Sequence, residues 1–451
     1  MTLASIILAA GEGTRMRSKL PKVLHPLAGR PMVWYALKAV EALTDLPPVL
    51  VVGHGAEAVK AAVGDAADYA LQAEQLGTGH AVLMAKPLLV EKADTLLVTF
   101  ADMPLLTEAT MTRLIEMHTA SDSPVTMTSF IGDEARGFGR VVRDDQGHVT
   151  AIVEQADANP EQLAIREYNV SAYCFDADWL WSALERIPVS PKGEYYLTDV
   201  VALAVDAGFP VDCLVLDDPD EAIGLNNRVH LAFAEKIMRK RINESWMLAG
   251  VTIVDPETTY IEKDVTIGRD TVIMPNTYLR GNTVIGEDCE IGPDTILLDT
   301  QVGNHTHLLA SVLEYARVAD HVTMGPYCHL RKDAVLDDGV HLGNFGEVKD
   351  SYLGPGTKMG HFSYIGNAKI GRDVNIGAGT ITCNYDGERK NLTEIGDDVF
   401  IGSDTMLVAP VKIGDRSVTG AGAVVTHDVP EDTLVMGVPA KVKRILERRD
   451  K

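Results

Sequence analysis

Cysteine is scarce in this sequence, and its five cysteines are dispersed without any Cys-x-x-Cys pair. They are Cys174, Cys213, Cys289, Cys328 and Cys383. An odd, scattered set does not fit a disulfide framework or a zinc site, and it is typical of an enzyme kept in a reducing compartment. We therefore expect free thiols and a cytoplasmic location.

Long apolar runs are missing as well. No apolar segment is long enough to cross a bilayer. The apolar run over residues 3–8 is short and has no basic region before it, so it does not read as a secretory signal. We expect no membrane partner.

Basic residues are in the minority, with 41 Lys and Arg against 64 Asp and Glu and a net charge of -23. This balance excludes a nucleic-acid backbone as the main partner, because such binding needs a basic face. An anionic small molecule would need a local cluster of cations. The length of 451 residues exceeds what one core can organise, so two or three domains are expected.

A glycine-containing loop follows the first apolar run, which reads as a buried strand. Glycines at the end of such a strand allow backbone N–H groups to approach a phosphate. The spacing is neither Gly-x-Gly-x-x-Gly nor a Walker loop, so on this element alone an ordinary strand-to-helix turn is the better interpretation. The residues that would form the phosphate cradle are Leu8, Ala9, Ala10 and Gly11.

The first half of the chain alternates strand-like and helix-like segments up to about residue 227, which predicts an α/β doubly wound, Rossmann-like domain. Ligands of such sheets bind beyond the carboxyl ends of the strands, where the opening loop and Asp102 should meet. Further strands are expected at 49–52, 95–100 and 125–130, and helices at 32–43, 80–89 and 108–118.

A helical stripe over residues 228–248 predicts a linker helix between a domain at 1–227 and another at 249–451. In the second domain aliphatic-glycine pairs recur at multiples of six residues. Gly268 and Gly286 are eighteen apart, and Gly303 follows with one residue missing. This period predicts a hexapeptide-repeat parallel β-helix, although glycine-rich β structure of another kind stays open. A break over 383–394 predicts a loop.

Four motifs, taken together with their order along the chain, resemble those of a known enzyme family. They are the opening loop with Pro21-Lys22, the segment at 72–80, the segment at 374–380 and the Cys-Asn-Tyr-Asp-Gly run at 383–387. Together they resemble the bacterial bifunctional N-acetylglucosamine-1-phosphate uridyltransferases and glucosamine-1-phosphate N-acetyltransferases. The resemblance covers nearly the whole chain and implies that the β-helix is left-handed.

The resemblance implies an enzyme of two steps. The second domain would acetylate glucosamine 1-phosphate with acetyl-CoA, and the first would couple the product to UTP with Mg²⁺, giving UDP-N-acetylglucosamine and pyrophosphate. That product serves peptidoglycan and lipopolysaccharide synthesis in cell wall biogenesis. The resemblance also implies a homotrimer.

For the uridyltransferase, the resemblance implies that Asp102 and Asn226 hold the metal, while Arg15 and Lys22 are catalytic cations on the phosphates. Mg²⁺ binds through one or two protein oxygens plus substrate phosphates, which suits this pair. From the residues alone, a turn or capping role for Asp102 is equally good. The chain departs from the family in having Ala101 where glycine usually precedes the metal aspartate.

The same resemblance assigns the residues that bind the base and the sugar. Taken singly, each of these residues is more readily interpreted as structural, with Gly139 in a turn and Glu154 at a strand end. The implied substrate-binding residues are Gln72, Gly77 and Thr78 for uracil, Gly139, Glu154 and Asn169 for the N-acetylated sugar, and Asn226, which is also a metal residue.

For the acetyltransferase, the amine of the substrate must lose a proton, and a histidine suits that task near neutral pH. Of the thirteen histidines, His361 matches the family's general base. The implied sugar-phosphate residues are Arg331, Lys349, Tyr364 and Asn375, and the implied acetyl-CoA residues are Ala378, Asn384, Tyr385, Ser403 and Ala421.

The tail departs from the better-known members, because residues 435–441 have no arginine before their proline. Lys441 or Lys443 is a possible substitute for the lost contact with the CoA phosphate. The sequence leaves two alternative functions open for the whole chain. One is a single-function sugar-1-phosphate nucleotidyltransferase whose β-helix oligomerises or regulates it, and the second is a non-catalytic scaffold or sensor.

Overall fold

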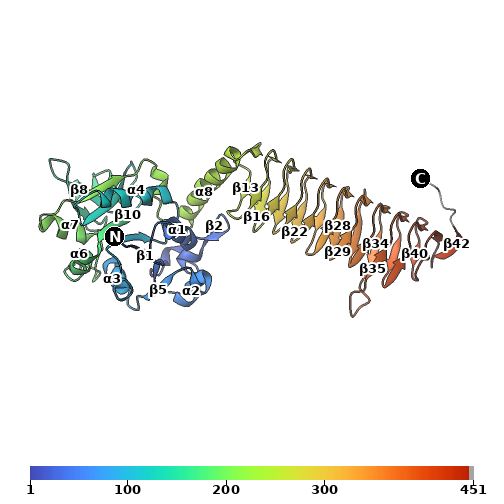
Figure 1. The fold of residues 1–451 in the computed structure, drawn as a ribbon, viewed down its shortest axis with the longest axis horizontal. Helices are drawn as coiled ribbons and strands as arrows, with labels where there is room; N and C mark the ends of the chain where they lie inside the picture. The colour runs from blue at the N-terminus through green and yellow to red at the C-terminus, as the bar shows by residue number, and fades with distance from the viewer. Residues whose placement is uncertain (446–451) are drawn as a thin grey trace. The chain divides into compact units, whose positions relative to one another are not determined.

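The computed structural model describes residues 1–445, and the chain divides into two compact units, Met1–Met238 and Arg239–Lys451. The boundary lies within α8 (Arg228–Leu248), the helix expected over 228–248. Figure 1 shows an α/β body in the first unit and stacked short strands in the second. Among residues 1–445, no helix combines the length and apolar character needed to span a bilayer.

The first unit is built on a twisted sheet in the order β11-β7-β10-β6-β1-β4-β5, with a hairpin of β8 and β9 attached to β10. Neighbours along this order are parallel except β10, which runs antiparallel between β6 and β7. The expected strands are confirmed. The bounds are β1 (Leu3–Leu8), β4 (Val49–Val52), β5 (Asp68–Leu71), β6 (Thr95–Phe100), β7 (Val125–Ile131), β8 (Arg140–Arg143), β9 (Val149–Val153), β10 (Glu167–Asp176) and β11 (Asp212–Val215), with a small pair β2 (Pro26–Leu27) and β3 (Arg30–Pro31) outside this sheet.

Helices cover both faces of this sheet, and two apolar cores lie between them, which is the doubly wound arrangement expected. β1 contributes alternate residues to each core, with Ile6 in one and Ile7 in the other. The helices are α1 (Met32–Glu41), α2 (Ala56–Val63), α3 (Thr78–Leu89), α4 (Glu108–Thr119), α5 (Pro160–Leu163), α6 (Ala177–Leu184) and α7 (Asp199–Asp206), with 3-10 turns η1 (Thr14–Met16), η2 (Lys22–Leu24), η3 (Gly64–Ala66) and η4 (Pro219–Glu221).

The second unit is a parallel β-helix in which short strands stack into three flat faces. The chain visits face one, face two and face three in turn on every coil. Face one holds β12 (Thr252–Ile253), β15 (Val272–Ile273), β18 (Glu290–Ile291), β21 (His307–Leu308), β24 (Thr323–Met324), β27 (His341–Leu342), β30 (Lys358–Met359), β33 (Asn375–Ile376), β36 (Phe400–Ile401), β39 (Val418–Thr419) and β41 (Thr433–Met436), closed by the antiparallel β42 (Lys441–Ile445).

The other two faces complete each coil. Face two holds β13 (Tyr260–Ile261), β16 (Tyr278–Arg280), β19 (Ile296–Leu298), β22 (Val312–Glu314), β25 (His329–Leu330), β28 (Gly346–Lys349), β31 (Ser363–Gly366), β34 (Ile381–Cys383), β37 (Met406–Val408) and β40 (Val424–Val425). Face three holds β14 (Thr266–Ile267), β17 (Val284–Ile285), β20 (Gln301–Val302), β23 (Arg317–Val318), β26 (Ala334–Leu336), β29 (Ser351–Leu353), β32 (Ala368–Ile370), β35 (Thr393–Ile395) and β38 (Val411–Ile413).

The six-residue period of the sequence reflects two requirements of the β-helix, a buried aliphatic residue and a glycine after it. Its aliphatic residue points inward, so that Ile267, Ile285 and Val302 form one buried column down face three. The glycine that follows lies against the next coil: a Cβ on Gly268 would be 2.5 Å from the backbone carbon of Gly286. Close stacking of the coils therefore requires glycine at this position. Stacking also buries the apolar inner side chains, which a single coil would expose to water.

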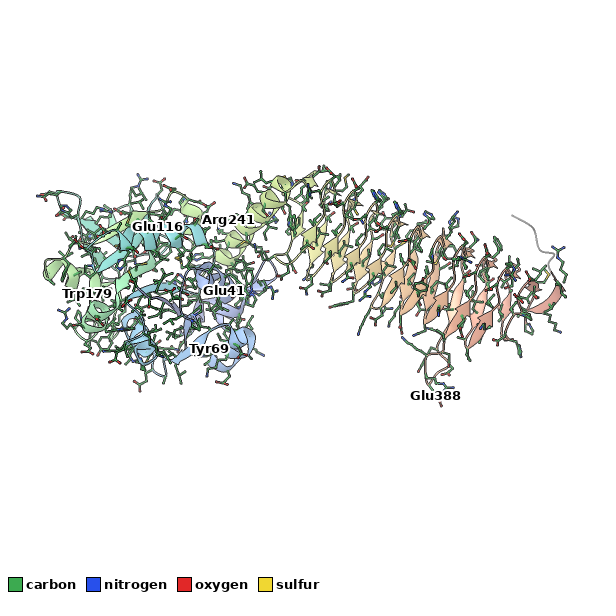
Figure 2. All side chains as sticks on the ribbon, viewed as in Figure 1. Glu41, Tyr69, Glu116, Trp179, Arg241 and Glu388 are labelled. Carbon is green, nitrogen blue, oxygen red and sulfur yellow. The ribbon has the colours of Figure 1, made fainter. Side chains whose placement is uncertain are left out.

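The expected break in the repeat is confirmed, because β34 and β35 are separated by a loop over residues 384–392. Figure 2 shows Glu388 at the tip of this loop, away from the stacked strands. The Asp386 carboxylate organises the loop by accepting hydrogen bonds from the backbone N–H of Arg389, the side chain of Asn391 and the backbone N–H of Glu388. These bonds lower the pKa of Asp386 to about 2.

Candidate functional site

The opening loop and Asp102 lie at the same edge of the first sheet. β1 and β6 are parallel neighbours with Leu8 paired to Phe100, so the segments that follow these two strands leave the sheet at the same edge. The segment that carries Asn226 is held at this edge by a hydrogen bond of 2.9 Å from the Leu225 N–H to the Asp102 carbonyl oxygen. Carboxyl ends of parallel strands are the usual ligand edge of such a sheet.

Three of the expected site residues meet there in direct contact. The Lys22 ammonium contacts the Asp102 carboxylate and lies 2.8 Å from Asn226 Oδ1. The Lys22 and Asp102 side chains are 12% and 25% exposed, so the pair is largely withdrawn from water. Two side-chain oxygens from separate segments thus converge on one cationic centre.

The loop itself packs on this cluster. Gly13 has φ +64°, and a Cβ there would be 2.5 Å from Lys22 Cβ, so glycine is required for the loop to lie against the lysine. Arg15, in η1, is exposed and forms neither a hydrogen bond nor an ion pair with residues 1–445. Ala101 is fully buried in an apolar core, so its methyl group packs there and not in the loop.

The segment expected to bind uracil is tied to the opening loop. The Gln75 side-chain amide donates to the Ala10 carbonyl oxygen at 3.0 Å, a contact that the motif at 72–80 does not reveal by itself. The buried Gln72 amide donates to the Gly77 carbonyl oxygen at 2.9 Å. The Thr78 hydroxyl accepts the Leu197 N–H at 2.9 Å, so this side chain already has a structural partner.

The three residues expected at the sugar come together on the hairpin and β10. The Asn169 N–H donates to the Gly139 carbonyl oxygen at 3.0 Å. A Cβ on Gly139 would be 3.2 Å from the carbonyl oxygen of Val153, the residue before Glu154. Burial raises the pKa of Glu154, although a hydrogen bond from Thr198 works in the opposite direction.

In the second unit, three of the four expected sugar-phosphate residues, Arg331, Lys349 and Tyr364, lie along face two. The Arg331 N–H donates to Val348 O at 2.9 Å, which stacks Arg331 beside Lys349 on consecutive coils, as their spacing predicted. Tyr364 is on the next strand, β31. The Asn384 amide donates to the side chain of Asn367 at 2.7 Å and lies 3.5 Å from the Tyr364 hydroxyl.

Lys390 joins this group and was missed from the sequence. Its side chain, followed by the guanidinium of Arg331, holds the pKa of Lys349 below its ordinary value. Arg331 is itself paired with Glu347 at 2.9 Å. Arg331, Lys349 and Lys390 thus bring three cationic side chains together, one of them already paired with a carboxylate, and such a group favours an anionic ligand. The signal in the sequence was the Arg389-Lys390 pair inside the loop that interrupts the repeat.

His361 and three expected acetyl-CoA residues lie on the other edge of face two, at the corner with face one. Consecutive coils are joined there by backbone hydrogen bonds from Gly379 to Phe362, from Asp404 to Ala378 and from Gly422 to Ser403. One column therefore contains His361, Ala378, Ser403 and Ala421.

Two expected residues lie apart from these groups. Asn375 is on face one, paired with Lys358 and Phe400. Tyr385 is exposed, and its hydroxyl donates to Gly387 O within the loop at 2.6 Å.

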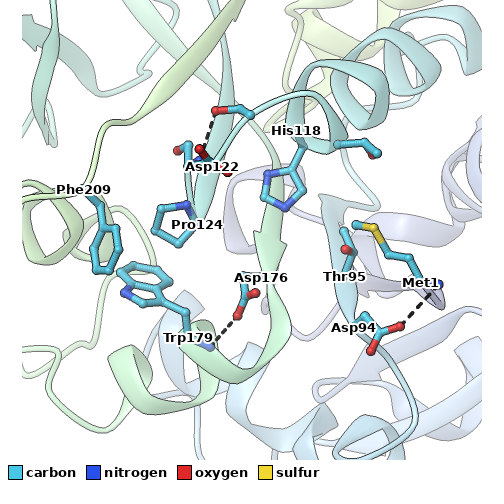
Figure 3. A pocket seen from close by; sticks show the side chains of 12 residues that line it. Met1, Asp94, Thr95, His118, Asp122, Pro124, Asp176, Trp179 and Phe209 are labelled. Atoms are coloured by element: carbon cyan, nitrogen blue, oxygen red, sulfur yellow. Dashed lines mark hydrogen bonds and ion pairs between the residues drawn. The ribbon is translucent and has the colours of Figure 1, made fainter.

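A pocket at the opposite edge of the first sheet does not fit the expected chemistry (Figure 3). Two of its acidic groups have structural partners, since Asp176 caps α6 by accepting the Trp179 N–H and Asp94 accepts the Thr2 N–H. His118 is buried against Thr126, and burial lowers its pKa. The pocket is next to the first residues of β6 and β7, the edge remote from Asp102.

Comparison with known proteins assigns a different family to each of the two units. Residues 5–188 match the MobA-like NTP transferase domain, and residues 264–298 and 392–427 match the bacterial transferase hexapeptide (six repeats). Fold and site together define a nucleotidyltransferase joined to a left-handed, hexapeptide-repeat acyltransferase, and a nucleoside triphosphate is the natural substrate of the first.

Curated relatives extend over almost the whole chain. The chain is 47% identical over 433 residues to the bifunctional protein GlmU of Heliobacterium modesticaldum, covering 96% of this chain and 94% of that protein. The bifunctional protein GlmU of Pelobacter propionicus is 47% identical over 446 residues, with 98% and 97% covered. The Streptococcus agalactiae serotype V protein of the same name is 45% identical over 446 residues, with the same coverage. The chain belongs to this family, and the resemblance found in the sequence is confirmed.

Proposed function

We propose that this enzyme makes UDP-N-acetylglucosamine in two consecutive steps, with acetyl transfer in the second unit and uridylyl transfer in the first. The observation that carries the proposal is the convergence of Lys22, Asp102 and Asn226 at the ligand edge of the sheet. The stacking of Arg331 beside Lys349 on consecutive coils of the second unit supports the other step. The relatives are named bifunctional, which favours this assignment over a single-function nucleotidyltransferase.

In uridylyl transfer, a phosphate oxygen of N-acetylglucosamine 1-phosphate attacks the α-phosphorus of UTP. The bond from that phosphorus to the bridging oxygen of the β-phosphate breaks, and pyrophosphate leaves. The protein contributes position and charge, since this transfer needs little covalent help. The backbone N–H groups of Ala10 and Gly11, together with Arg15 and Lys22, hold the phosphates and neutralise charge that develops on them. Leu8 and Ala9 fix the loop to the sheet, and the Ala9 N–H is donated to Val51 O at 2.9 Å.

Asp102 and Asn226 fit a magnesium ion, because their side-chain oxygens already converge on the cationic nitrogen of Lys22. Within residues 1–445 no cluster of three or more His, Cys, Asp or Glu forms a metal site. Two protein oxygens suffice for Mg²⁺, which takes its remaining ligands from water and phosphate. When bound, the ion supplies a Lewis acid for the triphosphate.

The base and the sugar are recognised at either side of this centre. The Gln72 amide nitrogen is occupied by Gly77, and its Oε1 has no hydrogen-bond partner among residues 1–445, so this oxygen can accept the N3–H of uracil. Gly77 and Thr78 complete the uracil-binding segment. Gly139, Glu154 and Asn169 bind the N-acetylated sugar, and Asn226 contacts the substrate where it meets the metal ion.

In acetyl transfer, the amine of glucosamine 1-phosphate attacks the thioester carbonyl carbon of acetyl-CoA. The carbon–sulfur bond breaks, and His361 takes the proton from the amine and returns it to the departing thiolate. Arg331, Lys349 and Lys390 grip the phosphate, and their charge complements it. Tyr364 and Asn375 contact the sugar.

Acetyl-CoA lies along the corner that begins at His361. The small side chains of Ala378, Ser403 and Ala421 leave room for it on successive coils, and Asn384 and Tyr385 contact it from the interrupting loop. One of the two exposed lysines of β42, Lys441 or Lys443, takes the place of the missing arginine at the CoA phosphate.

The active assembly is a homotrimer in the cytoplasm. Exposed aromatic side chains at one corner of the β-helix, including the stacked rings of Tyr327 and Phe345, support self-association. The cysteines within the described residues are free, which is consistent with a reducing compartment.

A coupled assay tests the proposal. Purified protein is supplied with glucosamine 1-phosphate, acetyl-CoA, UTP and Mg²⁺, and one component is omitted at a time. Omission of acetyl-CoA should stop pyrophosphate release, and adding N-acetylglucosamine 1-phosphate should restore it. Pyrophosphate release from UTP and glucosamine 1-phosphate without acetyl-CoA would contradict the proposed order of steps.

A further inference from the structure

Residues 195–198, which we call the bridging segment, lie between the uracil-binding segment and Glu154. At one end the segment is bonded to the residues around Gly77. The Tyr195 N–H donates to Leu76 O at 2.8 Å, and the Tyr195 carbonyl oxygen accepts the Gly79 N–H at 2.8 Å. With the bond from the Leu197 N–H to Thr78 Oγ1, three hydrogen bonds fasten the two segments.

Two glycines make this close contact possible. A Cβ on Gly77 would be 2.5 Å from the carbonyl oxygen of Tyr195 and 2.7 Å from its nitrogen. A Cβ on Gly79 would be 3.2 Å from the same carbonyl oxygen and 3.6 Å from the Leu197 nitrogen. The backbones of the two segments therefore lie in direct contact. A shift of the uracil-binding segment would displace the bridging segment as well.

At its other end the bridging segment reaches the proposed sugar site. The Thr198 hydroxyl donates to Glu154 Oε1 at 3.2 Å, and Thr198 is only 7% exposed. Burial raises the pKa of Glu154, and the bond from Thr198 is the largest influence that favours its charged form. α7 begins at Asp199 and packs against β9, which fixes the end of the segment against the hairpin.

We propose that the bridging segment couples the nucleotide to the sugar phosphate, and that Thr198 is the positioning residue that orients Glu154 for the sugar. This rests on the proposed function of Glu154. A nucleotide bound at Gln72 and Gly77 orders the bridging segment, and the ordered segment holds Glu154 in place. By linkage, each substrate then raises the affinity for the other by the same factor.

Thr198→Val tests the positioning role, because valine keeps the shape and removes the donor. The KM for N-acetylglucosamine 1-phosphate should rise about tenfold, which corresponds to about 1.4 kcal/mol and matches a lost hydrogen bond to a charged group. The KM for UTP and kcat should change less than about twofold. Thr198→Ser should restore the wild-type KM. Thr128→Val, which removes another buried hydroxyl of this unit, is the matched control.

Calorimetry tests the coupling directly. The Kd for N-acetylglucosamine 1-phosphate is measured with Mg²⁺, with and without a non-hydrolysable UTP analogue. The analogue should tighten sugar binding several-fold in the wild type and hardly at all in Thr198→Val. Equal affinities in the wild type with and without the analogue would overturn the coupling. A Thr198→Val protein with a lowered Tm and both KM values raised alike would show a merely structural role.

Glu154→Gln separates this inference from the proposed function beneath it. If Glu154→Gln leaves the Kd for the sugar phosphate unchanged, the proposed sugar site itself is wrong. If Glu154→Gln weakens sugar binding and Thr198→Val does not, the sugar site stands and the role of the bridging segment is refuted.

Discussion

The Lys22 ammonium lies 2.8 Å from Asn226 Oδ1, although the two residues are 204 positions apart in the sequence. The same nitrogen contacts the Asp102 carboxylate. The lysine thus pairs with the Asp102 carboxylate and donates a hydrogen bond to the Asn226 amide oxygen, the two groups proposed to hold the metal ion. We expect Lys22 to turn toward the phosphates when the ion binds, so that its two proposed roles belong to different stages of substrate binding.

The first prediction is that Lys22 and the metal ion compete. Without nucleotide, Lys22→Met should bind Mn²⁺ about tenfold more tightly than the wild type, because removal of a cation in contact with both oxygens relieves charge repulsion. Free Mn²⁺ is measured by electron paramagnetic resonance during titration. Uridylyl transfer should fall sharply in the same protein, since the phosphates lose a cation.

The control for this titration is Lys19→Met, which removes an exposed lysine from the same stretch of chain. It should leave Mn²⁺ affinity close to that of the wild type. Unchanged or weaker Mn²⁺ binding in Lys22→Met would show that the lysine does not compete with the ion.

The second prediction concerns pH at the proposed sugar-phosphate cluster. Lys390 lowers the pKa of Lys349, so Lys349 loses its positive charge at a lower pH than an ordinary lysine as the pH rises. The affinity for glucosamine 1-phosphate should therefore weaken on the alkaline side. In Lys390→Met, affinity should be lower overall, but its alkaline decline should shift to higher pH because the pKa of Lys349 recovers.

Calorimetry between about pH 8 and 10.5 measures this decline, a range set by the ordinary lysine pKa. Titration of the ligand itself is common to both proteins and cancels in the comparison. An alkaline decline at the same pH in both proteins would contradict the role given to Lys390.

The third prediction concerns the tail. Lys441→Ala combined with Lys443→Ala should raise the KM for acetyl-CoA about threefold to tenfold, because a phosphate contact with exposed lysines is modest and screened by salt. The same variant should have an unchanged KM for acetyl-3′-dephospho-CoA. An equal rise for both thioesters would place the CoA phosphate elsewhere.

Local pattern predicted the strands that are continuous apolar runs, such as β1 and β6, and the glycines of the β-helix. It did not predict β10, which is inserted antiparallel between β6 and β7, because polar residues such as Asn169 and Ser171 interrupt its apolar residues and leave no continuous apolar run. Local pattern was also insufficient to identify every residue of the proposed sites. Asp102 and Lys22 stand in recognisable motifs, whereas Lys390 and Thr198 acquire their roles only through folding contacts.

The central claim is that one chain carries two separate sites, and a pair of variants assayed for both partial reactions tests it most directly. Asp102→Ala should lose uridylyl transfer by about a hundredfold or more, since both the metal and the phosphates depend on this carboxylate, and should keep acetyl transfer. His361→Ala should lose acetyl transfer by about a hundredfold to ten-thousandfold, the usual worth of a general base, and keep uridylyl transfer. Loss of both activities in either folded variant would contradict two separate sites.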